Sequence, residues 1–409
     1  MGDILPSGHH RLSGLTGLGV KPDNRIFGLD LMRAVAIMLV LLLNGDPLMR
    51  RNFPGFPRFW FMDGVDLFFV LSGFLIGRIL INTFEKSDFS LQAILRFWKF
   101  RWFRTLPNYY LILPITILFE YFKDGNIHDV DWRYFFFLQN LTGPIPPFFT
   151  ISWSLVVEEW FYLTFPLVVY VLARMSSRLT VRSTVLLTTF FFILFPFVLR
   201  VLKVYSIANP ADVSDVFNFE MDFRAVAMFR PDSIAFGVLG AYVSHYHAET
   251  WFRYRFHSFA AGAVIYLLYR VYDEGLVKFT IGFTISSFAL SLLLPLASSV
   301  RTGPSLIAVP VTHLSIVSYS AYLIHRTLVM DAFRALGGRP FSDLQAVVYY
   351  ILYFVITILL STLLYKYFEA PILRLREKPL FSRSNSDAGE VNPSAKERVP
   401  VLHERENVV

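Results

Sequence analysis

The chain has 409 residues, of which 55% are hydrophobic and only 17% are charged, and its mean hydropathy is +0.49. A soluble chain carries about a quarter charged residues, so this composition excludes a water-soluble fold and indicates a polytopic membrane protein. The net charge of +7 comes from basic loops between apolar runs and not from a nucleic-acid-binding surface. The absence of cysteine excludes disulfides, thiolate metal sites and a thiol-bound acyl-enzyme.

The apolar runs predict an all-α fold, a membrane bundle of about ten transmembrane helices, because about 20 apolar residues cross the hydrocarbon core. A polar tail, 1–24, precedes the bundle. A second tail, 377–409, has mixed charges and few aromatic residues, which predicts disorder. The stretch Tyr134–Leu141 is too short to span and is expected at the membrane interface. The predicted spans centre on 27–45, 65–83, 104–122, 151–173, 182–202, 231–246, 257–272, 279–297, 311–332 and 345–368.

The loops differ in charge from one side of the predicted bundle to the other. Basic residues gather after the second and fourth spans and after the last one, whereas the alternate loops are richer in acids. The positive-inside rule therefore predicts a cytoplasmic (inner) membrane protein with both termini in the cytoplasm. Three basic residues in a predicted outer loop run against this pattern: Arg50, Arg51 and Arg58.

The first span, GLDLMRAVAIMLVLLLN, carries Asp30 and Arg33 near its start and Asn44 at its end. A charged side chain within a span normally faces the bundle interior and marks function, although an arginine near a helix end can instead extend to the lipid headgroups. Asn44 follows Arg33 by eleven residues, about three turns or ~16 Å, on nearly the same helix face. The second span, DGVDLFFVLSGFLIG, has Ser72 at its centre.

Arg101 and Arg104 lie in RFWKFRWFRTLPNYY at the start of the third span. Residues three apart share a helix face, and guanidinium groups contact phosphates in a planar, bidentate way. These residues are therefore candidates for binding an anionic ligand. Topological anchoring at the cytoplasmic surface is the alternative.

The fourth span, SWSLVVEEWFYLTFP, contains Trp153 and the adjacent carboxylates Glu158 and Glu159. Adjacent helical residues point about 100° apart, so at most one of the two carboxylates can point directly into a cavity. Glu158 is a candidate acid, base or arginine partner. The alternative is an ion pair with Arg33 or Arg230 that only holds helices together.

Two later runs carry further polar candidates. RPDSIAFGVLG begins with Arg230 and Asp232, where the aspartate can cap the helix or face a cavity. SYSAYLIHR ends with His325, which is either a structural hydrogen-bond donor or a base. Glu369, before a proline near the end of the last span, is expected to be structural. No metal site is predicted, because His245 and His247 lack acidic or cysteine partners.

In this order, the runs resemble the membrane-bound acyltransferase-3 family over about residues 25–375, within a domain expected at 25–376. The resemblance implies transfer of an acyl group onto a sugar, with the acyl-CoA donor bound at Arg101 and Arg104. It selects Glu158 as the glutamate of the family's Trp-Ser-Leu-x-x-Glu pattern. It also aligns Arg33 with an arginine of the family, and it aligns Asn44 with a histidine that the family is thought to use as its catalytic base.

Asn44 cannot replace that histidine as a base, because a carboxamide does not titrate. His325 and Asp46 are the nearby candidates for the missing role. The resemblance then implies an O-acyltransferase that moves an acyl group, most simply acetyl, from acyl-CoA to a glycan hydroxyl in the lipid bilayer, with no cofactor. The alternative is a non-catalytic relative, a permease or assembly component of glycan export. The expected catalytic residues are Arg33, Asn44, Glu158 and His325, and the expected cavity residues are Asp30, Ser72, Trp153, Arg230 and Asp232.

Overall fold

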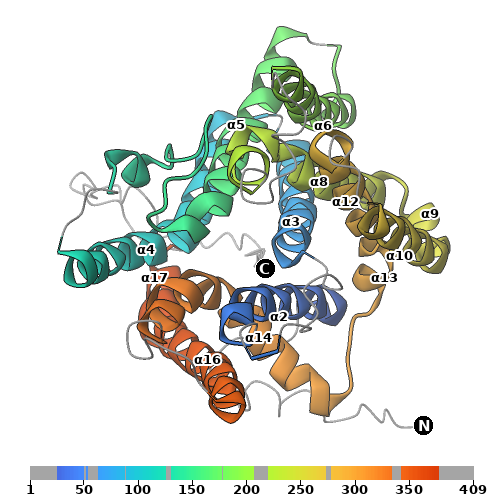
Figure 1. Cartoon of the computed structure of the whole chain (residues 1–409). Helices are drawn as coiled ribbons and strands as arrows, with labels where there is room; N and C mark the ends of the chain where they lie inside the picture. The colour runs from blue at the N-terminus through green and yellow to red at the C-terminus, as the bar shows by residue number, and fades with distance from the viewer. Residues whose placement is uncertain are drawn as a thin grey trace, which may run out of the picture.

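A computed structural model describes residues 25–49, 52–53, 63–87, 89–125, 130–176, 178–206, 220–272, 278–333 and 342–376. Within these ranges the chain forms helices and no strands, as the sequence predicts (Figure 1). The two predicted polar tails, 1–24 and 377–409, lie outside the described residues.

The helices follow one another with short connections. The long ones are α2 (Phe27–Met49), α3 (Gly64–Ser87), α4 (Leu91–Asp124), α5 (Trp153–Met175), α6 (Val181–Tyr205), α8 (Pro231–Tyr246), α10 (Arg255–Val271), α14 (Ser305–Ile324) and α16 (Asp343–Leu364). The shorter ones are η3 (Trp132–Phe136), η4 (Thr150–Ser152), η6 (Glu220–Arg224), η7 (Ala227–Phe229), α9 (Ala248–Arg253), η8 (Lys278–Gly282), α12 (Phe283–Ser291), α13 (Leu294–Ser299), η9 (His325–Met330), η10 (Tyr365–Glu369) and α17 (Ala370–Leu375).

Each of the ten predicted spans is helical over most of its length. Among the described residues, seven helices are long and apolar enough to cross a membrane, and they correspond to seven of those spans. The other three predicted spans correspond to α4, α8 and α10. Helix α4 has 34 residues and a strongly charged first half, whereas α8 and α10 have only 16 and 17 residues.

Helix α8 is short and lies in the interior, where most of its residues are buried and it packs against α3, α6 and α12 (Figure 1). Glycines bring α8 and α3 into backbone contact. A Cβ atom on Gly73 would lie 1.9 Å from the carbonyl oxygen of Ile234, and one on Gly237 would lie 2.0 Å from that of Val70. This small-residue crossing is a common way to pack helices tightly in a membrane.

Helix α2 packs against α3, α14 and α16, so it joins the central helices to the C-terminal ones (Figure 1). Its first turn is fixed to the segment before α14, where the Gly28 N–H donates to the Val300 carbonyl at 2.9 Å. Because α2 contacts α3 on one side and the C-terminal helices α14 and α16 on the other, its polar residues can meet partners from both ends of the chain.

The predicted short interfacial stretch, Tyr134–Leu141, begins in the 3-10 helix η3 and continues as turns. The N-cap of η3, Asp131, accepts a hydrogen bond from the Arg133 N–H at 2.8 Å. Tyr134 is buried, whereas Trp132 and Phe136 are 64% and 65% exposed. Exposed aromatic rings of this kind favour the membrane–water interface, and the interfacial position stays a prediction.

Candidate functional site

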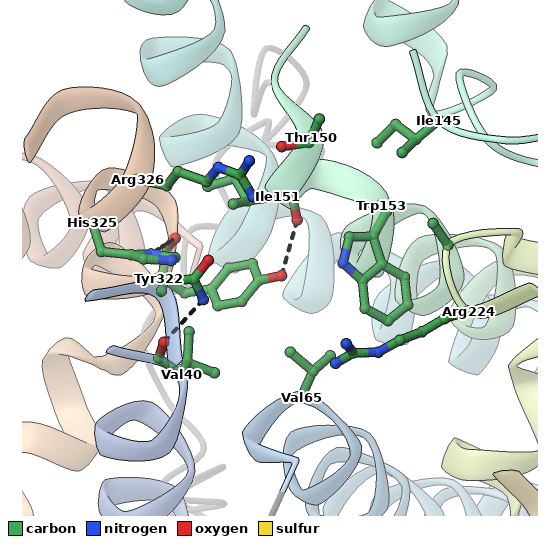
Figure 2. Close-up of a pocket in the computed structure, with 12 residues that line it drawn as sticks. Val40, Val65, Ile145, Thr150, Ile151, Trp153, Arg224, Tyr322, His325 and Arg326 are labelled. Atoms are coloured by element: carbon green, nitrogen blue, oxygen red, sulfur yellow. Dashed lines mark hydrogen bonds between the residues drawn. The ribbon is translucent and has the colours of Figure 1, made fainter. Parts of the chain in front are cut away.

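A cavity of about 130 Å³ lies where the ends of α2 and α14 meet the beginnings of α3 and α5 (Figure 2). Its lining residues are Val40, Asn44, Val65, Ile145, Thr150, Ile151, Trp153, Arg224, Ala225, Tyr322, His325 and Arg326. We call this the outer cavity, because the predicted topology places it at the outer end of the bundle.

His325 begins the π-helix η9, an irregularity that often marks functional sites. The imidazole is fully buried, and its Nδ1 lies 2.6 Å from the Tyr322 carbonyl oxygen. A carbonyl only accepts, so Nδ1 carries the proton and Nε2 keeps its lone pair. Nε2 is buried and makes no hydrogen bond in the described structure. A neutral imidazole lining a cavity with a free lone pair is well suited to accept a proton.

Asn44 lines the same cavity, although 281 positions separate it from His325. Its Nδ2 donates one hydrogen bond to the Val40 carbonyl at 2.9 Å. The second N–H and the side-chain oxygen remain available for a ligand. Asn44 of α2 and His325 of η9, at the end of α14, therefore line one cavity although they are far apart in the sequence.

Tyr322 fixes the loop wall of the cavity to α14. Its hydroxyl donates to the Ile151 carbonyl at 2.9 Å (Figure 2), and it also lies 2.7 Å from the Ser154 hydroxyl. Since the backbone carbonyl of Tyr322 also holds Nδ1 of His325, this tyrosine couples the position of the imidazole to the beginning of α5.

The opposite wall carries Trp153 and Arg224 (Figure 2). Arg224 forms an ion pair with Asp63, and its guanidinium lies 5.5 Å from the centre of the Trp153 ring. Figure 2 shows the indole nitrogen of Trp153 on the cavity side. An aromatic face and an N–H donor beside a candidate base suit a sugar ring and a polarised carbonyl oxygen.

Arg230 and Asp232 do not line the outer cavity but belong to a buried ion network behind Trp153. Arg230 pairs with Asp66 and lies over the Phe283 ring at 4.1 Å. Asp232 pairs with Arg200 at 2.8 Å, and both side chains are fully buried. Each charge is compensated, so the expected cavity role of these two residues becomes a role in joining α3, α6 and α8.

A second polar cluster, the arginine cluster, lies nearer the beginning of α2 and consists of Arg25, Arg33, Arg101 and Arg104. Asp30 holds Arg25 through a 2.8 Å hydrogen bond and an ion pair, and Ser315 of α14 donates to the same carboxylate at 2.7 Å. Asp30 thus belongs to this cluster and not to the outer cavity.

Arg101 contacts Glu158 at 3.2 Å and the Tyr162 hydroxyl at 2.6 Å, and its guanidinium lies 4.0 Å from the centre of the Tyr162 ring. The expected pairing of Glu158 with Arg33 or Arg230 is therefore wrong, because Arg101 reaches across from α4 and takes this carboxylate. Glu159 is 8% exposed, and its Oε2 has no hydrogen bond. Ser72 donates to the Phe69 carbonyl at 3.1 Å and does not line the outer cavity.

Glu369 lies beside Arg104, where its Oε2 accepts 2.7 Å hydrogen bonds from Asn108 and Ser320. It ties α4, α14 and η10 together, which agrees with its expected structural role. Asp46, the other candidate base, is buried but is not among the residues that line the outer cavity.

The predicted site residues thus do not form one site, because Arg230 and Asp232 lie in the buried ion network and most of the others divide between the outer cavity and the arginine cluster. Asn44, Trp153 and His325 line the outer cavity, whereas Arg33 and Arg104 lie in the arginine cluster. Sequence reasoning missed the roles of Tyr322, Arg224 and Arg326. Tyr322 and Arg326 stand within the same SYSAYLIHR run as His325, which was a usable signal, and Arg224 was a lone cation in an acidic loop.

Comparison with known proteins gives the family. The model of an acyltransferase domain, acyltransferase-3, matches residues 26–366. A "Peptidoglycan O-acetyltransferase OatA" of Listeria monocytogenes is 34% identical over 128 residues, which cover 25% of this chain and 19% of that protein. An "O-acetyltransferase OatA" of Staphylococcus aureus is 29% identical over 180 residues, 38% of this chain and 27% of that protein.

These matches take in less than a third of either curated relative's length. No solved structure matches the chain. The family model, in contrast, extends from the beginning of α2 to the end of the last long helix, and the ordered apolar motifs of the sequence fall within it. This multi-pass membrane protein therefore belongs to the acyltransferase-3 family.

Proposed function

We propose that this protein is an O-acyltransferase that moves an acyl group, most simply acetyl, from acyl-CoA to a glycan hydroxyl at the outer cavity. The observation that carries the proposal is the orientation of His325. Its Nδ1–H is fixed by a backbone carbonyl, and its Nε2 lone pair is buried without a partner at the cavity. This arrangement supplies the base that Asn44 cannot provide.

The reaction then proceeds at the outer cavity as follows. His325 Nε2 takes the proton of the acceptor hydroxyl as its oxygen attacks the thioester carbonyl. The second N–H of Asn44 and the indole N–H of Trp153 stabilise the negative charge on the carbonyl oxygen. Collapse of the intermediate forms the ester and breaks the bond to sulfur, and the imidazolium returns the proton to the thiolate.

The size and lining of the cavity support a small acyl group. A volume of about 130 Å³ lies well below the roughly 300–1,000 Å³ of sites that enclose a drug-sized ligand. The glycan would therefore present one hydroxyl at the cavity while the rest of the sugar remains outside it. The names of the relatives, which are O-acetyltransferases, support acetyl as the group and a cell-wall glycan as the acceptor.

The donor would enter from the opposite end, where the arginine cluster offers cationic groups for the phosphates of CoA. With basic loops in the cytoplasm, this end faces the cytoplasm and the outer cavity faces away from it, in the cytoplasmic membrane. Both chain termini are then cytoplasmic. This orientation supplies the donor from inside the cell and the acceptor from outside.

A permease or assembly component of glycan export is the other reading of the same bundle, since charged residues inside a membrane also line transport paths. Purified protein incubated with labelled acetyl-CoA and cell-wall glycan fragments separates the two. We expect label to appear as an ester on the glycan. Binding of CoA without release of free thiol or transfer of label would instead support the non-catalytic relative.

A further inference from the structure

The beginning of α3 carries two carboxylates, Asp63 and Asp66, which stand three residues apart in the sequence DGVD. Residues at this spacing share a helix face, and carboxylates are favoured at the positive end of the helix dipole. The Asp63 carboxylate also caps the helix, because it accepts a hydrogen bond from the Val65 N–H at 2.9 Å. Both carboxylates bind arginines: Asp63 pairs with Arg224, and Asp66 pairs with Arg230.

The two arginines meet at one aromatic side chain, Trp153 at the beginning of α5. The guanidinium of Arg224 lies 5.5 Å from the centre of the Trp153 ring, and that of Arg230 lies 5.9 Å from it. Both distances are within cation–π range. Phe69 of α3 packs edge-on against the same ring, with ring centres 5.8 Å apart and an interplanar angle of 89°. The orientation of Trp153 is therefore set by groups that α3 holds, either directly or through the two ion pairs.

The burial of Arg230 is costly for a group that only joins helices. Its side chain is fully buried, and its Nε and Nη1 atoms have no hydrogen-bond partner in the part of the chain that the structure describes. Only Nη2 donates hydrogen bonds, to Asp66 and, at 3.3 Å, to the Ser233 hydroxyl. Replacing a buried ion pair by apolar residues of similar volume is often neutral or stabilising, so stability alone does not account for this arrangement. The guanidinium lies instead among aromatic rings, one of which is Trp153.

We infer that the Asp66–Arg230 ion pair positions Trp153 for catalysis and keeps its indole N–H directed into the outer cavity. Arg230 is a positioning residue, because it does not line the cavity and contacts a ring that does. The indole N–H donates no hydrogen bond within the described residues, and its nitrogen lies on the cavity side (Figure 2). The Asp63–Arg224 pair contacts the same ring from the cavity wall. The inference rests on the proposed function, in which this N–H stabilises the carbonyl oxygen.

A double-mutant cycle between the ion pair and the indole tests the inference. Trp153→Phe removes the N–H and is expected to lower the single-turnover rate of acetyl transfer by about 10²–10³-fold, the usual effect of losing an oxyanion donor. Asp66→Asn/Arg230→Gln removes both charges, so neither partner is left buried and unpaired. This pair variant should lower the wild-type rate by about 10- to 100-fold, but the rate of Trp153→Phe by less than about threefold. Equal factors in the two backgrounds would overturn the inference.

The other buried pair of the same network, Arg200 with Asp232, is the matched control. Both side chains are fully buried, and the guanidinium of Arg200 lies 5.7 Å from the centre of the Phe283 ring. Within the described chain, Arg200 makes no contact with Trp153. Asp232→Asn/Arg200→Gln should therefore change the rate by the same factor with and without the indole. Coupling to Trp153 as strong as that of the Asp66–Arg230 pair would show that any loss of buried charge disturbs the site, and the inference would be wrong.

A fluorine spectrum tests the position of the indole without relying on activity. Protein labelled with 5-fluorotryptophan carries fluorine at its seven tryptophans, and the spectrum of Trp153→Phe identifies the resonance of Trp153. Asp66→Asn/Arg230→Gln should shift or broaden this resonance, whereas the control pair variant should leave it nearly unchanged. Arg230→Lys keeps a cation beside the ring but not the planar guanidinium, so it should give a smaller shift and a smaller loss of rate.

The same spectrum separates failure of the inference from failure of the proposed function. If the wild type transfers no acetyl group, the proposed function fails, and a shifted Trp153 resonance would still support the positioning role of Arg230. If the pair variant does not fold, Arg230→Lys takes its place in both measurements. An unchanged Trp153 resonance in a folded variant of Arg230 would contradict the inference, whatever the activity of the wild type.

Discussion

Replacing His325 with glutamine is expected to lower the rate of acyl transfer by about 10²–10⁴-fold, the usual contribution of a general base. Glutamine keeps a polar side chain of similar length but cannot accept and return a proton. The affinity for acetyl-CoA should stay within about twofold of the wild-type value, because the loss concerns the chemical step and not donor binding. Single-turnover rates report on the chemical step and equilibrium binding on the affinity for acetyl-CoA, so both are measured on the same preparation.

His313 of α14, the helix that precedes His325, provides a matched control. Its Nε2 lies 2.9 Å from the Thr362 hydroxyl of α16, and it does not line the outer cavity. His313→Gln should therefore transfer acetyl at nearly the wild-type rate. Full activity in a folded His325→Gln variant would exclude His325 as the base and would leave Asp46 as the candidate base.

Introducing histidine at position 44 is expected to restore activity to the His325→Gln variant. Both side chains line the outer cavity, so Asn44→His places an imidazole on the α2 wall of the cavity that lost one from the η9 wall. A restored base should recover a large part of the 10²–10⁴-fold loss. The measurement is the single-turnover rate of the double variant relative to His325→Gln alone.

Asn44→Ala in the His325→Gln variant is the control for this rescue, since alanine enlarges the cavity without supplying a base. It should leave the rate at the His325→Gln level. In the wild-type background, Asn44→Ala should only reduce the rate, by about 10- to 1,000-fold if its amide stabilises the oxyanion. Absence of rescue in a folded double variant would show that the two side chains cannot serve the same reacting group.

The apolar runs predicted the bundle well, because the hydrocarbon core imposes a length that can be read directly from the sequence. They predicted less well which helices lie in the interior of the bundle. Helix α8 is of near-minimal length for a span and lies in the interior, and this burial depends on its glycine contact with α3. The charged first half of α4 is also helical, and it buries Ile94 and Phe97 although no apolar run marks it.

The site was predictable in part. Asn44, Trp153 and His325 stand in recognisable runs, but their meeting at one cavity joins segments far apart in the chain. Helical periodicity places residues on a face and does not say which helix faces it. For that reason, a shared helix face predicts that Arg33 and Asn44 act together, whereas only Asn44 lines the outer cavity. Likewise, the partner of Glu158 depended on the packing of α4 against α5.

The proposed reaction path begins at the arginine cluster, which binds the phosphates of the donor, and ends at His325, which takes the proton of the acceptor hydroxyl. Sealed proteoliposomes of known protein orientation test it most directly, with labelled acetyl-CoA on one side and glycan fragments on the other. Label should appear on the glycan only when acetyl-CoA is supplied on the side of the arginine cluster and the glycan on the side of the outer cavity. Transfer that requires both substrates on the same side would contradict the account.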